Sequence, residues 1–504
     1  MKDGKKVRTL ALIASVLALA MGCVYPIVFI NWIVPLYAVC VAALTAAALL
    51  LFLALFTAGG KENPLRPAMI GTAVYVAALM GVTLLVNNLI FKGGMPWISA
   101  LVNTVLHGCF WLILLRLIRK RSGEAFVWKP LLCALLAIVG LAVSFAVTSP
   151  YVVNIFPITT HNEDKYFENW SAEQPFTREY CAELEKDPGK DFVILNLADV
   201  QLNTDEAMGE TGARVKAYTD RLVEEVQPDL ITLTGDNAWS SYAYLELIKL
   251  LESYDIPWAP VMGNHDGQGC SSEFWCAYKL SKAEHCLFRF GPKDMGYGNY
   301  IINITQNGEI IHTLFMMDTH SYIEDENSIN GPVSNDNYDH LWPNQFDWYV
   351  WALDGVAATA GRPVESTVIF HIPLYEYKTA WETATGVTDW ESDPDAPYIG
   401  EYADTSFGVR HEYGGWSPQS NGFFDLIKEK GSTKNVLCGH EHVNDFSILY
   451  QGVRLTYTLK VGAGCYWEPE LNGGTVLTVD GSGSASVAHH FIPADTPAKD
   501  STVC

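Results

Sequence analysis

Basic side chains are scarce in the larger part of this 504-residue sequence. Residues 151–504 contain 21 Lys and Arg against 53 Asp and Glu, which gives this part a formal charge of −32. A surface with that charge repels the phosphates of nucleic acids and of anionic lipids. We therefore expect no nucleic-acid partner, unless a local positive centre overrides the mean field.

Acidic side chains are almost absent from the first 150 residues, which hold three Asp and Glu against 12 Lys and Arg and are otherwise mostly apolar. Five apolar stretches come close to the ~20 residues that a helix needs to cross a bilayer. They cover residues 9–30, 33–57, 68–91, 96–118 and 130–148. Because a helix satisfies its own backbone polar groups in hydrocarbon, the sequence predicts an all-α transmembrane domain at residues 1–150, with about five helices.

The distribution of Lys and Arg predicts the orientation of these helices. Four basic residues precede the first stretch, two follow the second and five lie around the fourth loop, whereas the alternate loops hold only Lys92. The positive-inside rule then places the N-terminus in the cytoplasm. An odd number of spans delivers everything after Pro150 to the outside. We expect a multi-pass integral membrane protein with an extracytoplasmic C-terminal part and the lipid bilayer as a partner.

An alternative interpretation of the N-terminus rests on LALAMGC, which ends at Cys23. This stretch is similar to a lipoprotein signal with a lipid-acceptor cysteine. However, position 20 is Ala where such signals favour Leu, and the apolar character continues beyond Cys23. Both features favour a membrane helix.

Seven of the cysteines lie after residue 150, so at least one of them has no partner within this part of the chain. Cys270, Cys276 and Cys286 are close enough in sequence to form a small disulfide loop in an oxidising compartment. A zinc site that combines them with His265 or His285 is the alternative, although the spacing matches no tight ligand pattern.

From Asp191 onward, short β-branched runs alternate with stretches of helical periodicity, as is typical of an α/β domain with buried strands. The expected strands lie in DFVILNLADVQ, PDLITLTGDN, PWAPVMGNHD, TVIFHIPLYE and KNVLCGHEHVND. The expected helices lie in TGARVKAYTDRLVEEVQ, SYAYLELIKLLESY, QFDWYVWALDGVAA and NGFFDLIKEK. We place this domain at 191–495, after a polar juxtamembrane connector at 151–190 and before a tail at 496–504.

Polar side chains follow each of the expected strands, at the strand ends where ligands gather in α/β sheets. The set comprises Asp199, Gln201, Asp236, Asn264, His265, Asp266, His371, His440 and His442. Without His265 and Asp266 it supplies three imidazoles, two carboxylates and two amides. This mixture suits two borderline divalent ions better than one structural zinc. A carboxylate shared by both ions would hold them ~3.5 to 4 Å apart.

The blocks DVQ, GDN, GNHD, the lone His of FHIPL and GHEH, in this order, resemble those of the calcineurin-like metallophosphoesterases over about residues 191–495. Any one block is a weak signal, but five in order at strand ends are specific. IPWAPVMGNHD, FHIPLYEY and CGHEHVND are especially similar to the purple-acid-phosphatase-related branch. The resemblance implies an α/β fold, a four-layer sandwich of two mixed β-sheets flanked by helices.

The same resemblance implies how the ligands divide between two ions, which we expect to be Mn, Fe or Zn. Carried over position by position, Asp199, Gln201, Asp236 and His442 would bind the first metal, and Asp236, Asn264, His371 and His440 the second. Two residues depart from the family pattern. Gln201 stands where the first block usually has His, and we interpret it as a neutral oxygen ligand, with a damaged site as the alternative. Trp239 stands where the purple enzymes have Tyr, so no tyrosinate colour is expected.

Charges predict how such a site would work. Two divalent ions, two aspartates and a bridging hydroxide leave a net charge of about +1, which is the local exception to the acidic surface. A phosphate ester could bind both ions while the hydroxide attacks phosphorus in line. His265 could protonate the leaving oxygen, and Asp266 could orient its ring.

The sequence thus predicts a membrane-anchored, dinuclear-metal-dependent phosphoesterase that hydrolyses phosphate mono- or diesters. The substrate stays open, although lipid-linked phosphates are attractive because the site follows a membrane domain. The alternative is a non-catalytic sensor in which a degenerate site binds a phosphorylated ligand. The aromatic residues between Tyr375 and Trp416 either line a substrate pocket or pack an insertion, and DWESDPDAP at 389–397 is interpreted as a solvated acidic loop.

Overall fold

The computed structural model of this chain describes residues 163–268, 272–322, 338–389, 393–416 and 419–492. The predicted transmembrane domain at 1–150, the first part of the predicted connector and the tail at 496–504 lie outside these residues. Within the described ranges, no helix combines the length and the apolar character needed to cross a membrane.

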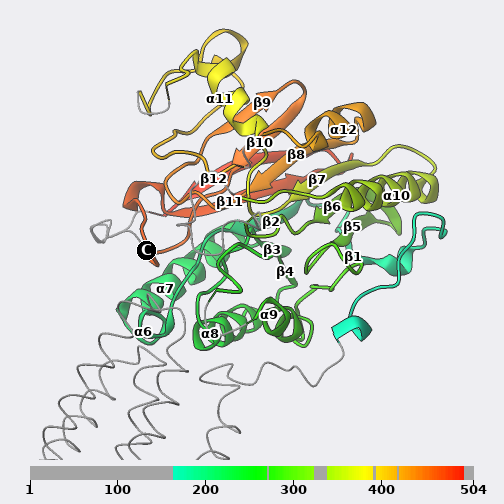
Figure 1. The fold of residues 1–504 in the computed structure, drawn as a ribbon, viewed down its shortest axis with the longest axis horizontal. Coiled ribbons are helices and arrows are strands. Elements are labelled where there is room, and N and C mark those ends of the chain that lie inside the picture. The colour runs from blue at the N-terminus through cyan, green and yellow to red at the C-terminus, as the bar shows by residue number, and fades with distance from the viewer. Residues whose placement is uncertain (1–162, 269–271, 323–337, 390–392, 417–418, 493–504) are drawn as a thin grey trace, which may run out of the picture. The chain divides into compact units, whose positions relative to one another are not determined.

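Two mixed β-sheets form the centre of the described unit (Figure 1). The five-stranded sheet has the order β12 (Ala485–Phe491), β11 (Gly473–Val479), β2 (Phe192–Leu197), β3 (Leu230–Leu233) and β4 (Trp258–Pro260). The seven-stranded sheet has the order β1 (Cys181–Glu185), β5 (Tyr300–Gln306), β6 (Glu309–Met316), β7 (Glu365–Ile369), β8 (Thr433–Cys438), β10 (Val453–Tyr457) and β9 (Ser447–Tyr450). Strands β2, β3 and β4 run parallel, as do β6, β7, β8 and β10. The prediction of two mixed sheets is confirmed.

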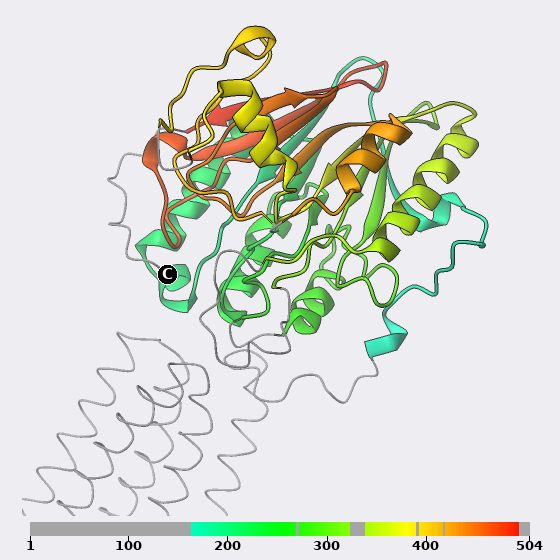
Figure 2. The same ribbon diagram turned by 45° about the horizontal axis from the view of Figure 1, so that its top comes forward.

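Helices cover the outer face of each sheet (Figures 1 and 2). The five-stranded sheet is flanked by α7 (Glu210–Val226), α8 (Ser241–Glu252) and α9 (Glu273–Leu280), with the short α6 (Thr204–Met208) beside them. The seven-stranded sheet is flanked by α10 (Pro343–Ala360), α11 (Glu376–Thr385) and α12 (Phe423–Lys430). Local chemistry defines their ends, since the Ser240 side chain caps the start of α8 and the left-handed Gly361 ends α10. The four predicted helices are all present.

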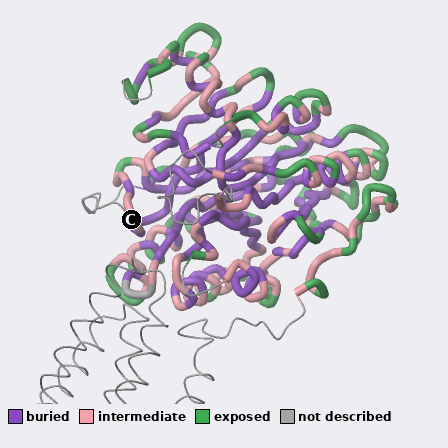
Figure 3. The backbone as a smooth tube through the Cα atoms, viewed as in Figure 1, coloured by how far each residue is buried: buried purple, intermediate pink, exposed green. Residues whose placement is uncertain are grey.

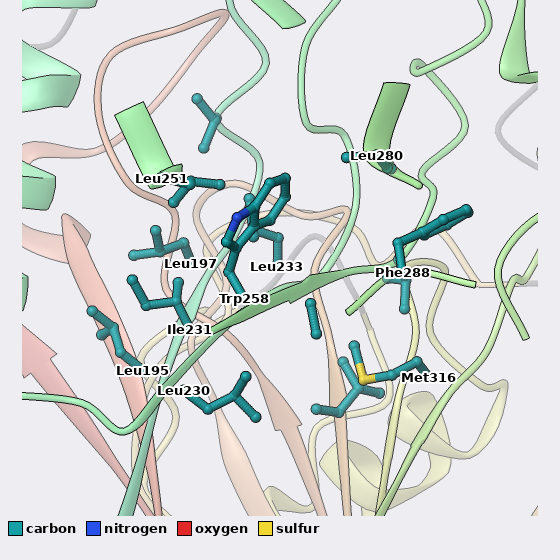
Figure 4. Close-up of a cluster of buried hydrophobic side chains, with 14 of the residues drawn as sticks. Leu195, Leu197, Leu230, Ile231, Leu233, Leu251, Trp258, Leu280, Phe288 and Met316 are labelled. Carbon is teal, nitrogen blue, oxygen red and sulfur yellow. The ribbon is translucent and has the colours of Figure 1, made fainter. Parts of the chain in front are cut away.

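Two apolar cores hold these layers together, and buried residues follow the strands in Figure 3. The larger core joins the helices α7–α9 to the five-stranded sheet and continues to the inner face of the other sheet, where Met316 lies (Figure 4). The second core lies under α10–α12. Tyr377 and Trp381, at most 1% exposed, belong to it, so in α11 the aromatic residues pack the fold. Burial of this apolar surface fixes the two sheets face to face.

The described part of the predicted connector belongs to the folded unit. Strand β1 pairs in parallel with β5, and it lies N-terminal to the predicted domain boundary at residue 191. Before β1, the amide of Glu168 donates to the carbonyl of Gly291, and the Trp351 indole donates to the carbonyl of Gln174. The folded unit therefore extends back to at least residue 163 in the described ranges.

The predicted disulfide loop is wrong for two of its three cysteines, because Cys276 and Cys286 are free. Cys276 lies on the buried face of α9, where its thiol donates to the carbonyl of Asp266 at 3.3 Å. Cys286 itself forms an isolated parallel β-bridge with Trp258. Cys270 lies outside the described residues. Cys465 is disulfide-bonded, which the sequence spacing did not predict.

Candidate metal centre

The carboxyl ends of five strands from both sheets meet at one place. Asp199 and Gln201 follow β2, Asp236 follows β3, Asn264 follows β4, His371 follows β7, and His440 and His442 follow β8. The sheets are joined there by the hydroxyls of Thr234 and Thr458, 2.9 Å apart. All seven predicted ligands are buried, and none is more than 8% exposed. Asp199, Asp236 and His371 each offer one ligand atom, and these atoms lie within 4.8 Å of one another.

His371 presents one ring nitrogen to this group. Its Nδ1 lies 2.8 Å from the carbonyl of Thr234 and donates to it, so Nε2 of a neutral ring carries a lone pair. That nitrogen faces Asn264 Oδ1 at 2.8 Å, His440 Nδ1 at 3.1 Å and Asp236 Oδ1 at 3.4 Å. The facing atoms are all potential metal ligands. Burial lowers the pKa of His371, but the Asp236 and Asp199 carboxylates outweigh it and raise this pKa to about 9. A proton on Nε2 therefore holds these acceptors together, and a cation could take its place.

Asp236 lies at the centre of the site. Its Oδ1 accepts from the backbone N–H of His265 at 2.8 Å, and its Oδ2 accepts from Gln201 Nε2 at 2.9 Å. Burial raises the pKa of this carboxyl, but the charges of His371 and His265 and the hydrogen bonds from the same two residues outweigh it and hold the pKa well below its usual range. Asp236 is therefore an ionised carboxylate that touches both halves of the predicted ligand set.

The other half of the site contains two buried acceptors that have no donor among the described residues, Asp199 Oδ2 and Gln201 Oε1. A buried acceptor without a partner costs about 1–3 kcal/mol. Burial raises the pKa of Asp199 to about 7, because this carboxylate lacks sufficient positive charge around it. A divalent ion would supply the missing partner to both oxygens. The donor set therefore fits a metal, and Gln201 presents an amide oxygen to it, as a neutral ligand would.

His442 completes this half. Its Nδ1 donates to the carbonyl of Tyr466 at 2.9 Å, which leaves Nε2 to face Asp199 Oδ1 at 3.9 Å. The rings of His442 and Tyr466 also stack at 4.1 Å. Lys460 donates from Nζ to the main-chain carbonyl of Asp199. A hydrogen bond such as that from His442 Nδ1 to Tyr466 fixes the tautomer and the orientation of a metal-binding imidazole.

The two predicted acid–base residues have different surroundings. His265 is partly exposed, and its Nε2 lies 4.0 Å from Asp236 Oδ2. Asp266 is buried and accepts from the main chain of Gly263, Asn237 and Ala238 at 2.8–3.2 Å. Its carboxylate therefore holds the loops after β3 and β4 together. The Nδ1 atom of His265 lies 2.5 Å from Gln268 Oε1. Gln268, and not the expected Asp266, therefore orients the His265 ring.

The sequence interpretation missed several residues around the site. Gln268 contacts His265, and the hydroxyl of Tyr322 contacts Asn264 Nδ2 at 3.1 Å. Tyr466 lies beside His442, and Gly415 donates its backbone N–H to Glu441. Only Gln268 carried a usable signal, because it lies three residues after His265 in the same turn. The others lie in loops that no motif connects to the ligands.

Comparison with known proteins places this site in a family. The model of the calcineurin-like phosphoesterases matches residues 192–444. The phosphatase DCR2 of Saccharomyces cerevisiae is 29% identical over 290 residues, which cover 52% of this chain and 46% of that protein. The probable inactive purple acid phosphatase 14 of Arabidopsis thaliana is 27% identical over 272 residues, which cover 48% of this chain and 60% of that protein.

This chain thus spans less than two thirds of the length of these relatives. Among solved structures, a dimetal phosphatase from Danio rerio matches with a TM-score of 0.36 and 11% identity, over 57% of this chain and 93% of that chain. The family match covers half of the sequence and includes all seven predicted ligands. The chain belongs to the calcineurin-like phosphoesterase family.

Proposed function

We propose that this protein is a membrane-anchored phosphoesterase that uses two divalent ions to hydrolyse phosphate mono- or diesters outside the cytoplasm. The observation that carries the proposal is the buried set of seven predicted ligands, in which two oxygens, Asp199 Oδ2 and Gln201 Oε1, have no hydrogen-bond donor among the described residues. Such a set is costly to bury unless cations occupy it.

Each residue has a part in this proposal. Asp199, Gln201, Asp236 and His442 would hold one ion, and Asp236, Asn264, His371 and His440 the other. Bound divalent ions supply positive charge to phosphoryl oxygens and lower the pKa of water towards neutrality. We keep Mn, Fe and Zn as the expected metals, because imidazole, carboxylate and amide donors together suit them.

Proton transfer to the leaving group falls to His265. Its Nδ1 is engaged by Gln268 Oε1, so Nε2 is the atom that would give a proton to the departing oxygen. The ring is further held by the edge of Trp239, whose centroid lies 5.0 Å away. Asp266 contributes indirectly, because it holds the loop that carries Asn264 and His265.

Membrane attachment and location are supported by the sequence. The five apolar stretches in residues 1–150 and the excess of basic residues in alternate loops favour a cytoplasmic N-terminus. The disulfide at Cys465 supports an oxidising compartment for the folded unit, since such bonds are rare in the cytosol. A substrate that is itself linked to lipid fits this arrangement.

A non-catalytic sensor is the second candidate, and two observations favour it. The Arabidopsis relatives are named probable inactive purple acid phosphatases, and Gln201 stands where the family usually has a histidine. In this alternative the site would bind metal and a phosphorylated ligand without turnover.

One experiment separates the two candidates. The full chain in detergent micelles, loaded in turn with Mn, Fe and Zn, is assayed on monoesters, diesters and nucleotides beside the Asp236→Asn variant. Metal-dependent hydrolysis that the variant lacks supports the enzyme. Stoichiometric metal and phosphate binding without hydrolysis of any of these esters supports the sensor and contradicts the enzyme.

A further inference from the structure

Tyr322 lies beside the half of the site that would hold the second ion. It follows β6, and its backbone forms an antiparallel bridge with Tyr338. The two rings stack with centroids 5.3 Å apart, and the edge of His440 meets the Tyr338 ring at 4.4 Å. Stacking and the backbone bridge together fix the position of the Tyr322 ring. Its hydroxyl is thereby held next to Asn264.

The hydrogen bonds of the Tyr322 hydroxyl leave its proton available. Asn264 turns Oδ1 towards His371, so its Nδ2 donates to Tyr322 Oη at 3.1 Å. Gln268 turns Oε1 towards His265 and donates from Nε2 to Tyr322 Oη at 3.4 Å. A phenol has two lone pairs and one proton, and these amides use only the lone pairs. Tyr322 Oη is thus the acceptor in both hydrogen bonds described for it, and its O–H can donate to a further group.

The position of this donor indicates its target. Tyr322 Oη lies between Asn264, a predicted metal ligand, and Gln268, which holds the predicted acid His265. A phosphoryl group bound there, with its leaving oxygen at His265, would present a non-bridging oxygen on the same side.

We propose that Tyr322 is a catalytic residue that donates a hydrogen bond to a non-bridging oxygen of the transferred phosphoryl group. This inference rests on the proposed phosphoesterase function and adds a residue that lies outside the five sequence blocks. A donor aimed at a charged oxygen stabilises it more strongly than a neutral hydrogen bond does. Its stacked ring also lets the hydroxyl act without reorganisation.

The test uses Tyr322→Phe in the full chain, a change that keeps the stacked ring and removes only the hydroxyl. We expect kcat/KM for a phosphate ester to fall by about 10- to 100-fold and the inhibition constant of inorganic phosphate to rise in the same direction, with metal content unchanged. Tyr254→Phe is the matched control, because its hydroxyl donates to Asp220 at 2.7 Å on the outer helices. The control should match the wild type.

A phosphorothioate ester distinguishes substrate contact from structural support. Sulfur is a poor hydrogen-bond acceptor, so the wild type should lose more rate with the thio-ester than Tyr322→Phe does. Equal thio effects in both proteins, or a rate loss that follows a loss of metal, would mean that Tyr322 only positions Asn264 and would overturn the inference. An unchanged rate in the variant would also overturn it.

Failure of the proposed function gives a different result. In that case the wild type itself hydrolyses no ester under any of the metals, and calorimetric titration of the metal-loaded protein with inorganic phosphate replaces the rate measurement. Weaker phosphate binding by Tyr322→Phe than by the wild type and Tyr254→Phe still supports the contact. Equal phosphate affinities among the three proteins would overturn it.

Discussion

Four of the predicted metal ligands have a backbone conformation that is unusual for their residue type. Asp199, Gln201, Asp236 and His440 adopt φ angles of 51°, 43°, 47° and 81°. A non-glycine residue in such a region costs of the order of 1–3 kcal/mol, and such residues cluster at functional sites. The surrounding hydrogen bonds, such as Gln201 N–H to the Asp236 carbonyl at 3.0 Å, hold these conformations in place. The site thus accepts local strain in order to aim several side chains at one point.

Charge separates the contributions of Asp236 and Gln201. We predict that Asp236→Asn loses more bound metal and more activity than Gln201→Ala, because Asp236 is an ionised, central carboxylate and Gln201 offers one neutral oxygen. Gln201→His should stay active and shift preference towards zinc, since imidazole suits zinc better than an amide does. Elemental analysis of the purified variants measures metal per chain. Equal metal content in the wild type and Asp236→Asn would contradict the central assignment.

The decrease in rate caused by removing His265 should depend on the leaving group of the ester. An alkyl ester leaves as a basic alkoxide, so His265→Ala should slow its hydrolysis by about 10²- to 10⁴-fold. A nitrophenyl ester leaves as a stable phenolate and should be slowed much less. The two rate ratios are measured on one preparation with its metal content checked. A similar factor for both esters would show that His265 only positions phosphate or packs its loop.

His312 makes stability depend on pH away from the site. It is fully buried in β6, with Nδ1 donating to the carbonyl of Gly483 at 2.9 Å, and burial lowers its pKa from 6.5 to about 4. The unfolded chain therefore binds a proton between these values that the folded chain does not, so stability falls as pH drops from 6.5 towards 4. The loss amounts to at most about 3 kcal/mol. Urea unfolding at pH 7 and 4.5 should show a smaller acid loss for His312→Gln than for the wild type, and an equal loss would contradict this role.

At the residue scale the sequence could predict the ligands but not their neighbours. Asp199, Asp236 and His371 are recognisable because each follows an apolar strand within a familiar block. Tyr322 and Gln268 depend on how loops after β6 and β4 approach each other, and loop paths are set by tertiary contacts that no short motif encodes. The prediction that Asp266 orients His265 was wrong for the same reason, because the loop path places Gln268 beside the ring.

At the scale of elements, strands that end on a polar block were predictable, but the hairpins β5–β6, β9–β10 and β11–β12 were missed. Strands β2, β3, β4, β7 and β8 are short apolar runs that end on polar blocks, which is the pattern used to find them. The β5–β6 hairpin also had a signal, because Asn307 and Gly308 adopt φ angles of 55° and 80°, as an Asn-Gly hairpin turn requires. That dipeptide between two β-branched runs could have predicted the pair.

The turn after β3 allows His371 to approach the site closely. Gly235 has φ of +91°, and a Cβ there would lie 2.7 Å from His371 Nδ1. We predict that Gly235→Ala displaces the imidazole and lowers metal occupancy and activity several-fold. Gly308→Ala is the matched control, since Gly308 has φ of +80° and nothing within 4 Å of an added Cβ. Both variants carry backbone strain of about 1 kcal/mol or more, and metal loss in both alike would contradict a steric cause.

At the scale of the whole molecule, the pairing of strands that are far apart in the sequence could not be predicted. The ligands span residues 199 to 442 and come from both sheets, yet their order along the chain is enough to identify the family. The pairing of β1 with β5 joins segments about 120 residues apart in the sequence. The polar residues around Cys181–Glu185 did not indicate a strand there. For that reason part of the predicted connector is a strand of the folded unit.

This packing sharpens the prediction for membrane topology. Glu163 already accepts from the Tyr297 hydroxyl at 3.2 Å, and β1 completes a sheet, so a fragment that starts near residue 160 retains every described element. We predict that a protease recognition sequence inserted between residues 155 and 160 is cut from outside intact cells and releases an active fragment. The same sequence inserted in the loop between residues 121 and 125 should stay protected until the membrane is opened, because basic loops are retained in the cytoplasm. Detergent-treated cells control for access to both insertions. Cleavage of the 121–125 insertion alone in intact cells would reverse the orientation and place the metal centre in the cytoplasm, whereas cleavage of both would mean that one predicted span does not cross.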